Sequence, residues 1–156
     1  KIEKTSLVGS ILNDVGSMYA EMGDTIKAIQ IYNEAVPYHK SNGRNFKSGT
    51  FELTLADLYV QNGKLQKASP HLKQGFEIAS DLNSKRLLRD YYRILADYEI
   101  KKNNKSNALI AYQKLQAYVD SVSLGQLNNK IEELDSRHAI SISNEENQRL
   151  RNKNQT

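Results

Sequence analysis

The sequence predicts an all-α fold in which three helix pairs stack side by side and one long helix follows them. The chain of 156 residues repeats itself with a period of 40, most clearly at Ala28, Ala68 and Ala108. Apolar residues around each alanine keep the three-to-four-residue spacing of an amphipathic helix. Glycine or asparagine, which can adopt the left-handed backbone conformation that ends a helix, recurs with the same period. These turn residues are Gly23, Gly63 and Asn103. A period of this length indicates stacked helical repeats.

The first helix pair is predicted over residues 6–22 and 25–41. The step at Gly23-Asp24 ends the first helix and caps the second. Small residues on facing sides let the two antiparallel helices approach closely, and large residues fill the space beside them. The small residues are Gly16 and Ala28, and the large ones are Tyr19 and Tyr32. One such pair cannot bury its apolar face alone, so a neighbouring pair must stack against it.

The second pair is predicted over residues 46–62 and 65–82, and the third over 85–102 and 105–121. The third pair departs from the pattern at Glu99, where a tyrosine is expected, because Tyr98 stands one place early. We therefore expect its first helix to be slightly rotated. The turns between pairs are predicted at Asn42-Gly43 and Asn83-Ser84.

Two prolines fall inside predicted second helices. Pro37 and Pro70 each remove one backbone hydrogen bond, so each is expected to bend or break its helix. Pro70 would instead lie near the start of its helix if that helix begins late.

The last helix is predicted over residues 123–150. Leu127, Ile131 and Leu134 form an apolar stripe that is expected to cap the third pair. Beyond this stripe the helix becomes polar, so its second half is expected to project into solvent or to pair with a second copy of the chain. The predicted organisation is a repeat region over residues 1–122 with repeats at about 6–45, 46–84 and 85–122, the helix over 123–150, and a frayed tail over 151–156.

The first repeat resembles the tetratricopeptide repeat in residue type and spacing. The matching residues are Leu12, Val15, Gly16, Tyr19, Ala28 and Tyr32, with leucine in place of the usual tryptophan. The second copy reads Leu55, Ala56, Tyr59, Ala68 and Leu72, and the third reads Tyr92, Leu95, Ala96, Ala108 and Tyr112. The resemblance covers residues 6 to about 120 in a long-helix form with a 40-residue period. It implies a right-handed α-superhelix that binds other polypeptides and has no catalytic activity.

The C-terminal part carries a second resemblance. The Asp120-Ser121 step and the run Ile131-Glu132-Glu133-Leu134 resemble a junction in membrane-bound regulators of the Bacteroidetes type. In those proteins periplasmic repeats precede a membrane helix and then a histidine kinase or DNA-binding output domain. The resemblance implies the periplasmic sensor or scaffold region of a membrane-anchored signalling protein, with membrane contact only through a segment outside this chain. The alternative is a soluble cytoplasmic adaptor or the interaction domain of a transcription regulator.

The residues offer little for catalysis, metals or nucleic acids. There is no cysteine, and the three histidines, His39, His71 and His138, are isolated in sequence. Asp90 and Asp97 lie about two turns apart on one helix face, where a salt bridge with Arg93 is the simpler interpretation. The net charge of +4 comes from scattered basic side chains, so no direct nucleic-acid contact is predicted. No run of about 18 apolar residues is present. We expect no cofactor, no metal and no enzyme activity.

The resemblance implies that the first helix of each pair lines a concave groove. Side chains there that face away from the repeat core are the candidate binding residues. They are Asn13, Ser17, Glu21, Leu53, Asp57, Gln61, Arg93, Asp97 and Lys101. The version of the family that clamps a terminal carboxylate has lysine, arginine and asparagine at such places, and here Ser17 and Asp57 do not fit it. The mixed polar lining instead suits an extended peptide or a partner helix.

Overall fold

The computed structural model describes the backbone of residues 2–40, 45–119 and 121–153 and the side chains of residues 7–38, 45–119 and 124–153. These residues form seven helices and no strand. The helices are α1 (Ile2–Glu21), α2 (Thr25–Lys40), α3 (Phe46–Gln61), α4 (Leu65–Asp81), α5 (Lys85–Lys101), α6 (Lys105–Gln116) and α7 (Ser121–Lys153). The predicted all-α fold is confirmed. The expected turn at Asn42-Gly43 lies outside the described residues.

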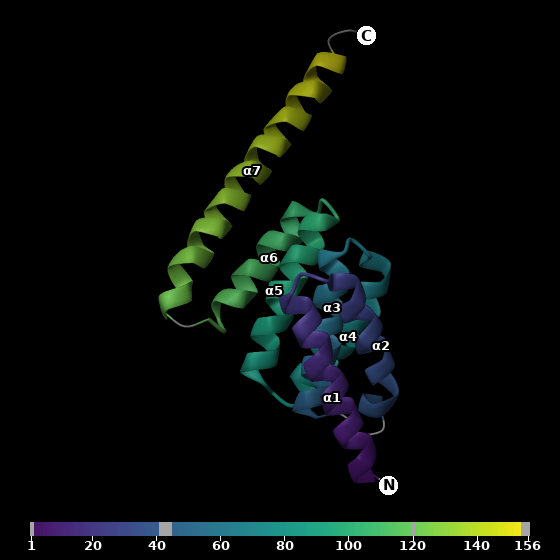
Figure 1. The fold of residues 1–156 in the computed structure, drawn as a ribbon. Coiled ribbons are helices and arrows are strands. Elements are labelled where there is room, and N and C mark those ends of the chain that lie inside the picture. The colour runs from purple at the N-terminus through teal and green to yellow at the C-terminus, as the bar shows by residue number, and fades with distance from the viewer. Residues whose placement is uncertain (1, 41–44, 120, 154–156) are drawn as a thin grey trace.

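The helices form three antiparallel pairs, α1 with α2, α3 with α4 and α5 with α6, which stack side by side (Figure 1). The first helix of each later pair packs against the second helix of the pair before it. The helix α7 packs against α6 and then extends beyond the body of the stack (Figure 1). None of the helices in the described ranges is both long and apolar enough to cross a membrane.

The turns lie where the repeat pattern predicts them. The turn residues Gly23, Gly63 and Asn103 have φ angles of 79°, 68° and 60°, in the left-handed region. Glycine adopts this region without a steric cost, and asparagine is among the few other residues found there. The predicted turn at Asn83-Ser84 is also present, with Asn83 at φ 46° and the Ser84 hydroxyl accepting a hydrogen bond from the Leu87 amide at 3.4 Å.

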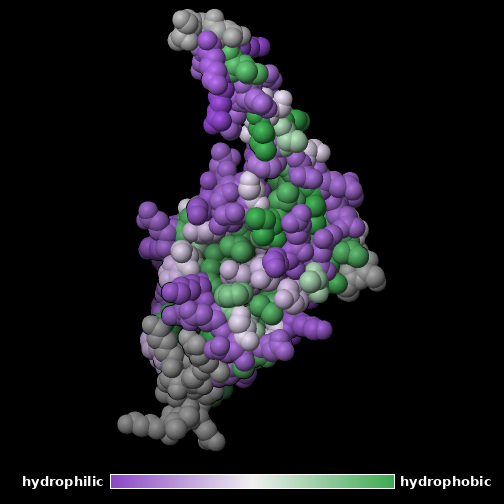
Figure 2. Space-filling view, turned by 180° about the vertical axis from the view of Figure 1, so that it is seen from behind, coloured by the Kyte–Doolittle hydropathy of each residue, from purple (hydrophilic) through white to green (hydrophobic). Residues whose placement is uncertain are grey.

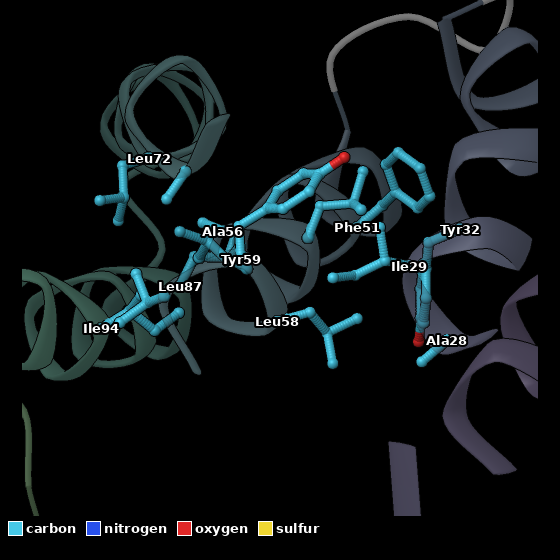
Figure 3. Packing of buried hydrophobic residues seen from close by; sticks show 14 of the residues in the cluster. Ala28, Ile29, Tyr32, Phe51, Ala56, Leu58, Tyr59, Leu72, Leu87 and Ile94 are labelled. Atoms are coloured by element: carbon cyan, nitrogen blue, oxygen red, sulfur yellow. The ribbon is translucent and has the colours of Figure 1, made fainter. Parts of the chain in front are cut away.

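The close approach inside the first pair depends on Gly16. A Cβ atom placed there would lie 2.6 Å from Cε2 of the Tyr32 ring, which real structures do not allow. Tyr32 in turn contacts Phe51 of the next pair, with ring centroids 5.8 Å apart. Figure 3 shows this continuous core running from Ala28 through Phe51 toward Ile94. The small-and-large pattern therefore joins helices within a pair and pairs to one another.

The two prolines do not break their helices. Pro37 lies inside α2 and Pro70 inside α4, and both helices continue past them, so the expected breaks are wrong. Both prolines lie on exposed helix faces, whereas Ala35 and Leu72 on the opposite faces are buried. Burial of these faces stabilises the helices by more than one lost hydrogen bond costs.

The C-terminal boundaries differ from the prediction. The helix α6 ends at Gln116 instead of 121, and the Tyr118 amide then donates to the Leu115 carbonyl in a tighter turn. This turn places the Tyr118 ring against Tyr92, with centroids 5.9 Å apart. The helix α7 runs to Lys153, so the tail expected to be frayed is helical over residues 151–153.

The apolar stripe of α7 covers the third pair as expected. Leu127 and Leu134 are buried in a second cluster with Ala111 and Leu115 of α6. In contrast, the surface of the distal part of α7 is mostly hydrophilic (Figure 2). The first half of α7 therefore closes the C-terminal end of the stack.

The third pair keeps its register at Glu99. This side chain is buried at the position that Tyr59 holds in the second pair, and the slight rotation of α5 stays a prediction. Among the described residues, the Oε2 atom of Glu99 has no hydrogen-bond partner, and Lys102 Nζ lies 4.0 Å from Oε1. The backbone repeat therefore holds even where a carboxylate replaces an aromatic ring.

Candidate peptide-binding groove

A hollow of about 350 Å³ lies where α1, α3 and α5 face one another. Its floor is apolar and its walls are polar. The floor residues are Ala20, Leu53, Leu58 and Ile94, and the wall residues are Glu21, Thr50, Thr54, Asp57, Gln61, Asp90 and Arg93. On each helix the lining residues are three or four positions apart and so share one face. The faces of the three helices lie next to one another and together form one surface.

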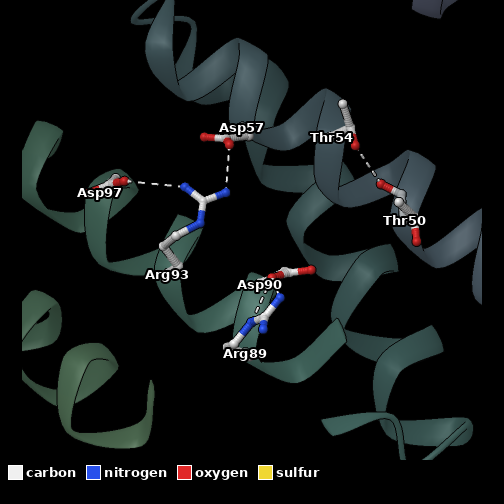
Figure 4. Close-up of polar contacts among 7 residues, drawn as sticks. All are labelled: Thr50, Thr54, Asp57, Arg89, Asp90, Arg93 and Asp97. Carbon is white, nitrogen blue, oxygen red and sulfur yellow. Dashed lines mark hydrogen bonds and ion pairs between the residues drawn. The ribbon is translucent and has the colours of Figure 1, made fainter. Parts of the chain in front are cut away.

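The wall is crossed by an ion pair between helices. The Arg93 guanidinium of α5 donates to Asp57 Oδ2 of α3 at 2.7 Å and lies 3.9 Å from Asp97 Oδ2 (Figure 4). On the same helix Arg89 lies 2.9 Å from Asp90 (Figure 4). Of the two carboxylates on α5 that could have formed an acid–base pair, Asp97 therefore lies next to Arg93 as predicted, whereas Asp90 pairs with Arg89 instead.

The electrostatics of this network follow from partial burial. Burial by itself lowers the pKa of Arg93, but the hydrogen bond and charge of Asp57 outweigh it, so the pKa is raised. Burial raises the pKa of Asp97, against the opposing charge of Arg93. Burial and the neighbouring Asp97 raise the pKa of Tyr112, which donates to Asp97 at 3.4 Å, to about 12. The network therefore holds the Arg93 guanidinium beside two acidic side chains in fixed positions.

A second hollow of about 470 Å³ adjoins the first between α1 and α3. It shares Thr50 and Thr54 with the first hollow, so the two form one elongated depression. Its lining includes Asn13 and Ser17, and the Ser17 and Tyr32 hydroxyls are hydrogen-bonded at 2.9 Å. The groove thus runs across the first helices of all three pairs.

Most of the predicted groove residues meet in these hollows. Glu21, Leu53, Asp57, Gln61 and Arg93 line the first, and Asn13 and Ser17 line the second. Asp97 and Lys101 do not line either one. Asp97 contacts Arg93, and Lys101 Nζ donates to the Gln61 carbonyl at the end of α3 at 3.2 Å. The last two residues therefore support the wall from outside.

Leu53 corrects the prediction that it faces away from the core. Its side chain is only 2% exposed and packs into a notch at Gly75 of α4. A Cβ atom at Gly75 would lie 2.5 Å from Leu53 Cδ2, so the absence of that atom makes room for the leucine. Leu53 belongs to the floor of the groove and to the core at once.

Three wall residues were not predicted. Thr50, Thr54 and Asp90 line the first hollow, and the two threonine hydroxyls donate to backbone carbonyls one turn earlier in α3. All three lie one helical turn from predicted groove positions. Extending the groove face by one turn toward the helix start would have found Thr50 and Asp90, whereas Thr54 lies within the predicted range, next to Leu53.

The two histidines whose side chains are described, His71 and His138, lie apart from the groove. His71 Nδ1 is 2.7 Å from Glu52 Oε2, and the His71 ring stacks on Tyr59 at 5.6 Å. His138 Nε2 is 3.1 Å from the Ser106 hydroxyl, whereas the side chain of His39 lies outside the described residues. Across the part of the chain that the structure describes, no three acidic or histidine side chains are grouped to hold a metal ion.

Comparisons with known proteins agree with this architecture. Residues 9–36 and 53–82, which lie in α1–α2 and α3–α4, match the family model of the tetratricopeptide repeat. Repeats of this kind are generally protein-interaction modules. No curated protein shows a significant match to the sequence.

Two solved structures share the fold. BtubC (BKLC) from P. vanneervenii is 18% identical with a TM-score of 0.77, over 86% of this chain and 58% of that one. This chain therefore spans 58% of the length of BtubC. The N-terminal domain of stress-induced protein-1 (STI-1) from C. elegans is 19% identical with a TM-score of 0.63, over 84% of this chain and 97% of that domain. At these identities the similarity shows the fold alone.

Proposed function

We propose that the groove across α1, α3 and α5 binds an extended segment of another polypeptide and that the domain has no catalytic role. The observation that carries this proposal is the Asp57–Arg93 ion pair beside an apolar floor in an elongated open depression. Fixed polar groups can bond to a peptide backbone, and the floor can accept its apolar side chains. The scattered basic residues favour a protein over a nucleic acid as partner.

The test is selection of binding peptides from a random displayed library, followed by titration calorimetry. Arg93→Glu should lower the affinity for a selected peptide by at least about tenfold. The substitution removes the guanidinium as a hydrogen-bond donor and places a third carboxylate beside Asp57 and Asp97. Lys114→Glu is the matched control, since it makes the same charge change on an exposed side chain of α6. Equal affinities for both variants would place the binding surface elsewhere.

We further propose that the domain is the sensor or scaffold region of a membrane-anchored bacterial signalling protein located in the periplasm. The support is the resemblance of the Asp120-Ser121 step and the Ile131–Leu134 run to such regulators. A ligand in the groove would act on an output domain through α7. The alternative is a cytoplasmic adaptor or regulator domain. A tagged full-length product should fractionate with the membrane and be cut by protease added to the periplasm; a cytosolic product would favour the alternative.

The distal part of α7 is proposed as a contact between two copies of the chain. It extends beyond the body of the stack (Figure 1). Its side chains Ile140, Ile142 and Leu150 are exposed. A single helix with so little packing gains stability from a partner. Light scattering should give the mass of a dimer, and the double variant Ile140→Glu with Ile142→Glu should give a monomer. A monomeric parent chain would refute this contact.

A further inference from the structure

An apolar stripe runs along the outer side of α1. Leu7, Ile11, Met18 and Met22 are each between 51% and 75% exposed. At 100° per residue, these four side chains fall within an arc of roughly 60° on the helix. Ile26 at the start of α2 is also exposed. This stripe differs from isolated apolar surface residues, because its members share one face.

The internal repeat shows what this face does elsewhere in the molecule. Forty residues after Ile11 and Met18 stand Phe51 and Leu58, which are only 2% and 3% exposed. Phe51 is covered from the preceding pair by Tyr32 of α2, at 5.8 Å between ring centroids. The middle of the face that is open on α1 is therefore covered on α3, whereas Lys47, the equivalent of Leu7, is exposed there.

The third pair repeats this arrangement. Tyr91 of α5 stands 80 residues after Ile11 and contacts Phe76 of α4, with ring centroids 4.8 Å apart. Leu87, which is equivalent to Leu7, is fully buried. Two of the three first helices thus receive the second helix of a neighbouring pair on the face that α1 leaves open.

The opposite end of the stack is built differently. The exposed side of the first half of α7 carries polar side chains such as Glu132, Asp135 and Ser136. A terminal element with a polar outer face closes a solenoid, whereas an apolar one needs a further layer. α7 has the character of a closing helix and α1 does not.

We infer that the α1 stripe is a docking surface for an amphipathic α-helix, which packs on α1 as α2 packs on α3 and α4 on α5. Asp14 and Glu21 are exposed along the groove-side flank of the stripe. The docked helix is therefore one with a continuous apolar face and lysine or arginine along one edge. The four stripe residues line neither hollow of the groove, although the flanking Asp14 and Glu21 do. The occupant of the stripe is a helix instead of an extended peptide.

The test supplies such a helix in the register of the repeat. A copy of residues 45–84 is joined directly ahead of Thr5, which keeps the 40-residue period. The copied α4 should then pack on α1 in the way that α4 packs on α5. Because the chain has no cysteine, Met18→Cys introduces a single thiol whose alkylation rate reports exposure. The extension should slow alkylation by at least about tenfold, and adding Ile11→Glu should restore it. Lys114→Cys on α6 is the control whose rate should not change.

Three results would overturn the inference. Alkylation at Met18→Cys could stay fast in the extended chain, whether or not the added pair folds. The alkylation rate could fall in the extended chain and stay low when Ile11→Glu is added, which would mean that the stripe is not the contact. The unextended chain could instead form a dimer that Ile11→Glu dissociates while Ile142→Glu does not, which would make a second copy the occupant.

Discussion

The second and third helix pairs share one backbone register but differ in what their first helices carry. At equivalent positions 40 residues apart, α3 has buried Leu53 and Tyr59, whereas α5 has Arg93 in the groove wall and the buried carboxylate of Glu99. The second pair is therefore the better packed, and the third brings most of the charge. The repeat therefore determines where a side chain lies. The residue type at that position determines whether the side chain stabilises the fold or is available to bind a partner.

The largest expected difference concerns equivalent leucines. Leu55 is fully buried and Leu95 is only half-buried. Leu55→Ala should lower the free energy of unfolding by about 3–4 kcal/mol, and Leu95→Ala by about 1–2 kcal/mol. Urea unfolding followed by circular dichroism measures both. Equal losses would show that the third pair is packed as tightly as the second.

Alkaline pH should affect the third pair through Tyr112, whose equivalent in the second pair, Leu72, cannot ionise. The folded pKa of Tyr112 is raised to about 12 from an ordinary value of 10.0. The stabilising contribution is therefore complete below about pH 10 and is lost as pH rises toward about 12. Between about pH 9 and about pH 11.5 the wild type should lose about 2 kcal/mol relative to Tyr112→Phe. A constant difference between the two proteins would contradict the raised pKa.

Removing the charge of Glu99 should make the third pair more like the second. Glu99→Gln should raise the free energy of unfolding by about 1 kcal/mol, because a neutral amide costs less to bury than a carboxylate. Thermal unfolding of the two proteins at neutral pH measures the change. A destabilised variant would mean that Lys102 compensates the carboxylate more fully than its 4.0 Å distance indicates.

The smallest expected effect on stability is at the groove ion pair. Arg93 and Asp57 are both partly exposed, and such pairs contribute about 0–1 kcal/mol. Arg93→Ala should therefore change the free energy of unfolding by less than about 1 kcal/mol in urea. A larger loss would mean that Arg93 is chiefly structural, which would weaken the case for recognition.

The sequence predicted the repeat well, because its evidence is local and periodic. The turn residues Gly23, Gly63 and Asn103 and the stripe at Leu127 depend on helix geometry alone, and the structure confirms them. In contrast, the end of α6 depends on the contact of Tyr118 with Tyr92. Local helix propensity cannot predict this contact, because Tyr92 lies on another helix.

The sequence predicted which helix faces form the candidate site, but it did not predict how deeply each side chain is buried. Helical periodicity needs only spacing, and it grouped Asp57 and Arg93, whose side chains form an ion pair in the structure. It misplaced Leu53, because burial there depends on Gly75, which lies on another helix. The continuity of α2 and α4 past their prolines was missed for the same reason, since tertiary packing outweighs local propensity.

The most direct test of the central claim is to map a bound peptide by nuclear magnetic resonance. Backbone amide shifts of the labelled chain would be followed during titration with a peptide selected for binding. If the groove is the binding surface, the largest shifts will be at Thr50, Thr54, Asp57 and Arg93, on the facing sides of α3 and α5. Shifts concentrated on α2, α4 and α6, with these four amides unchanged, would contradict it.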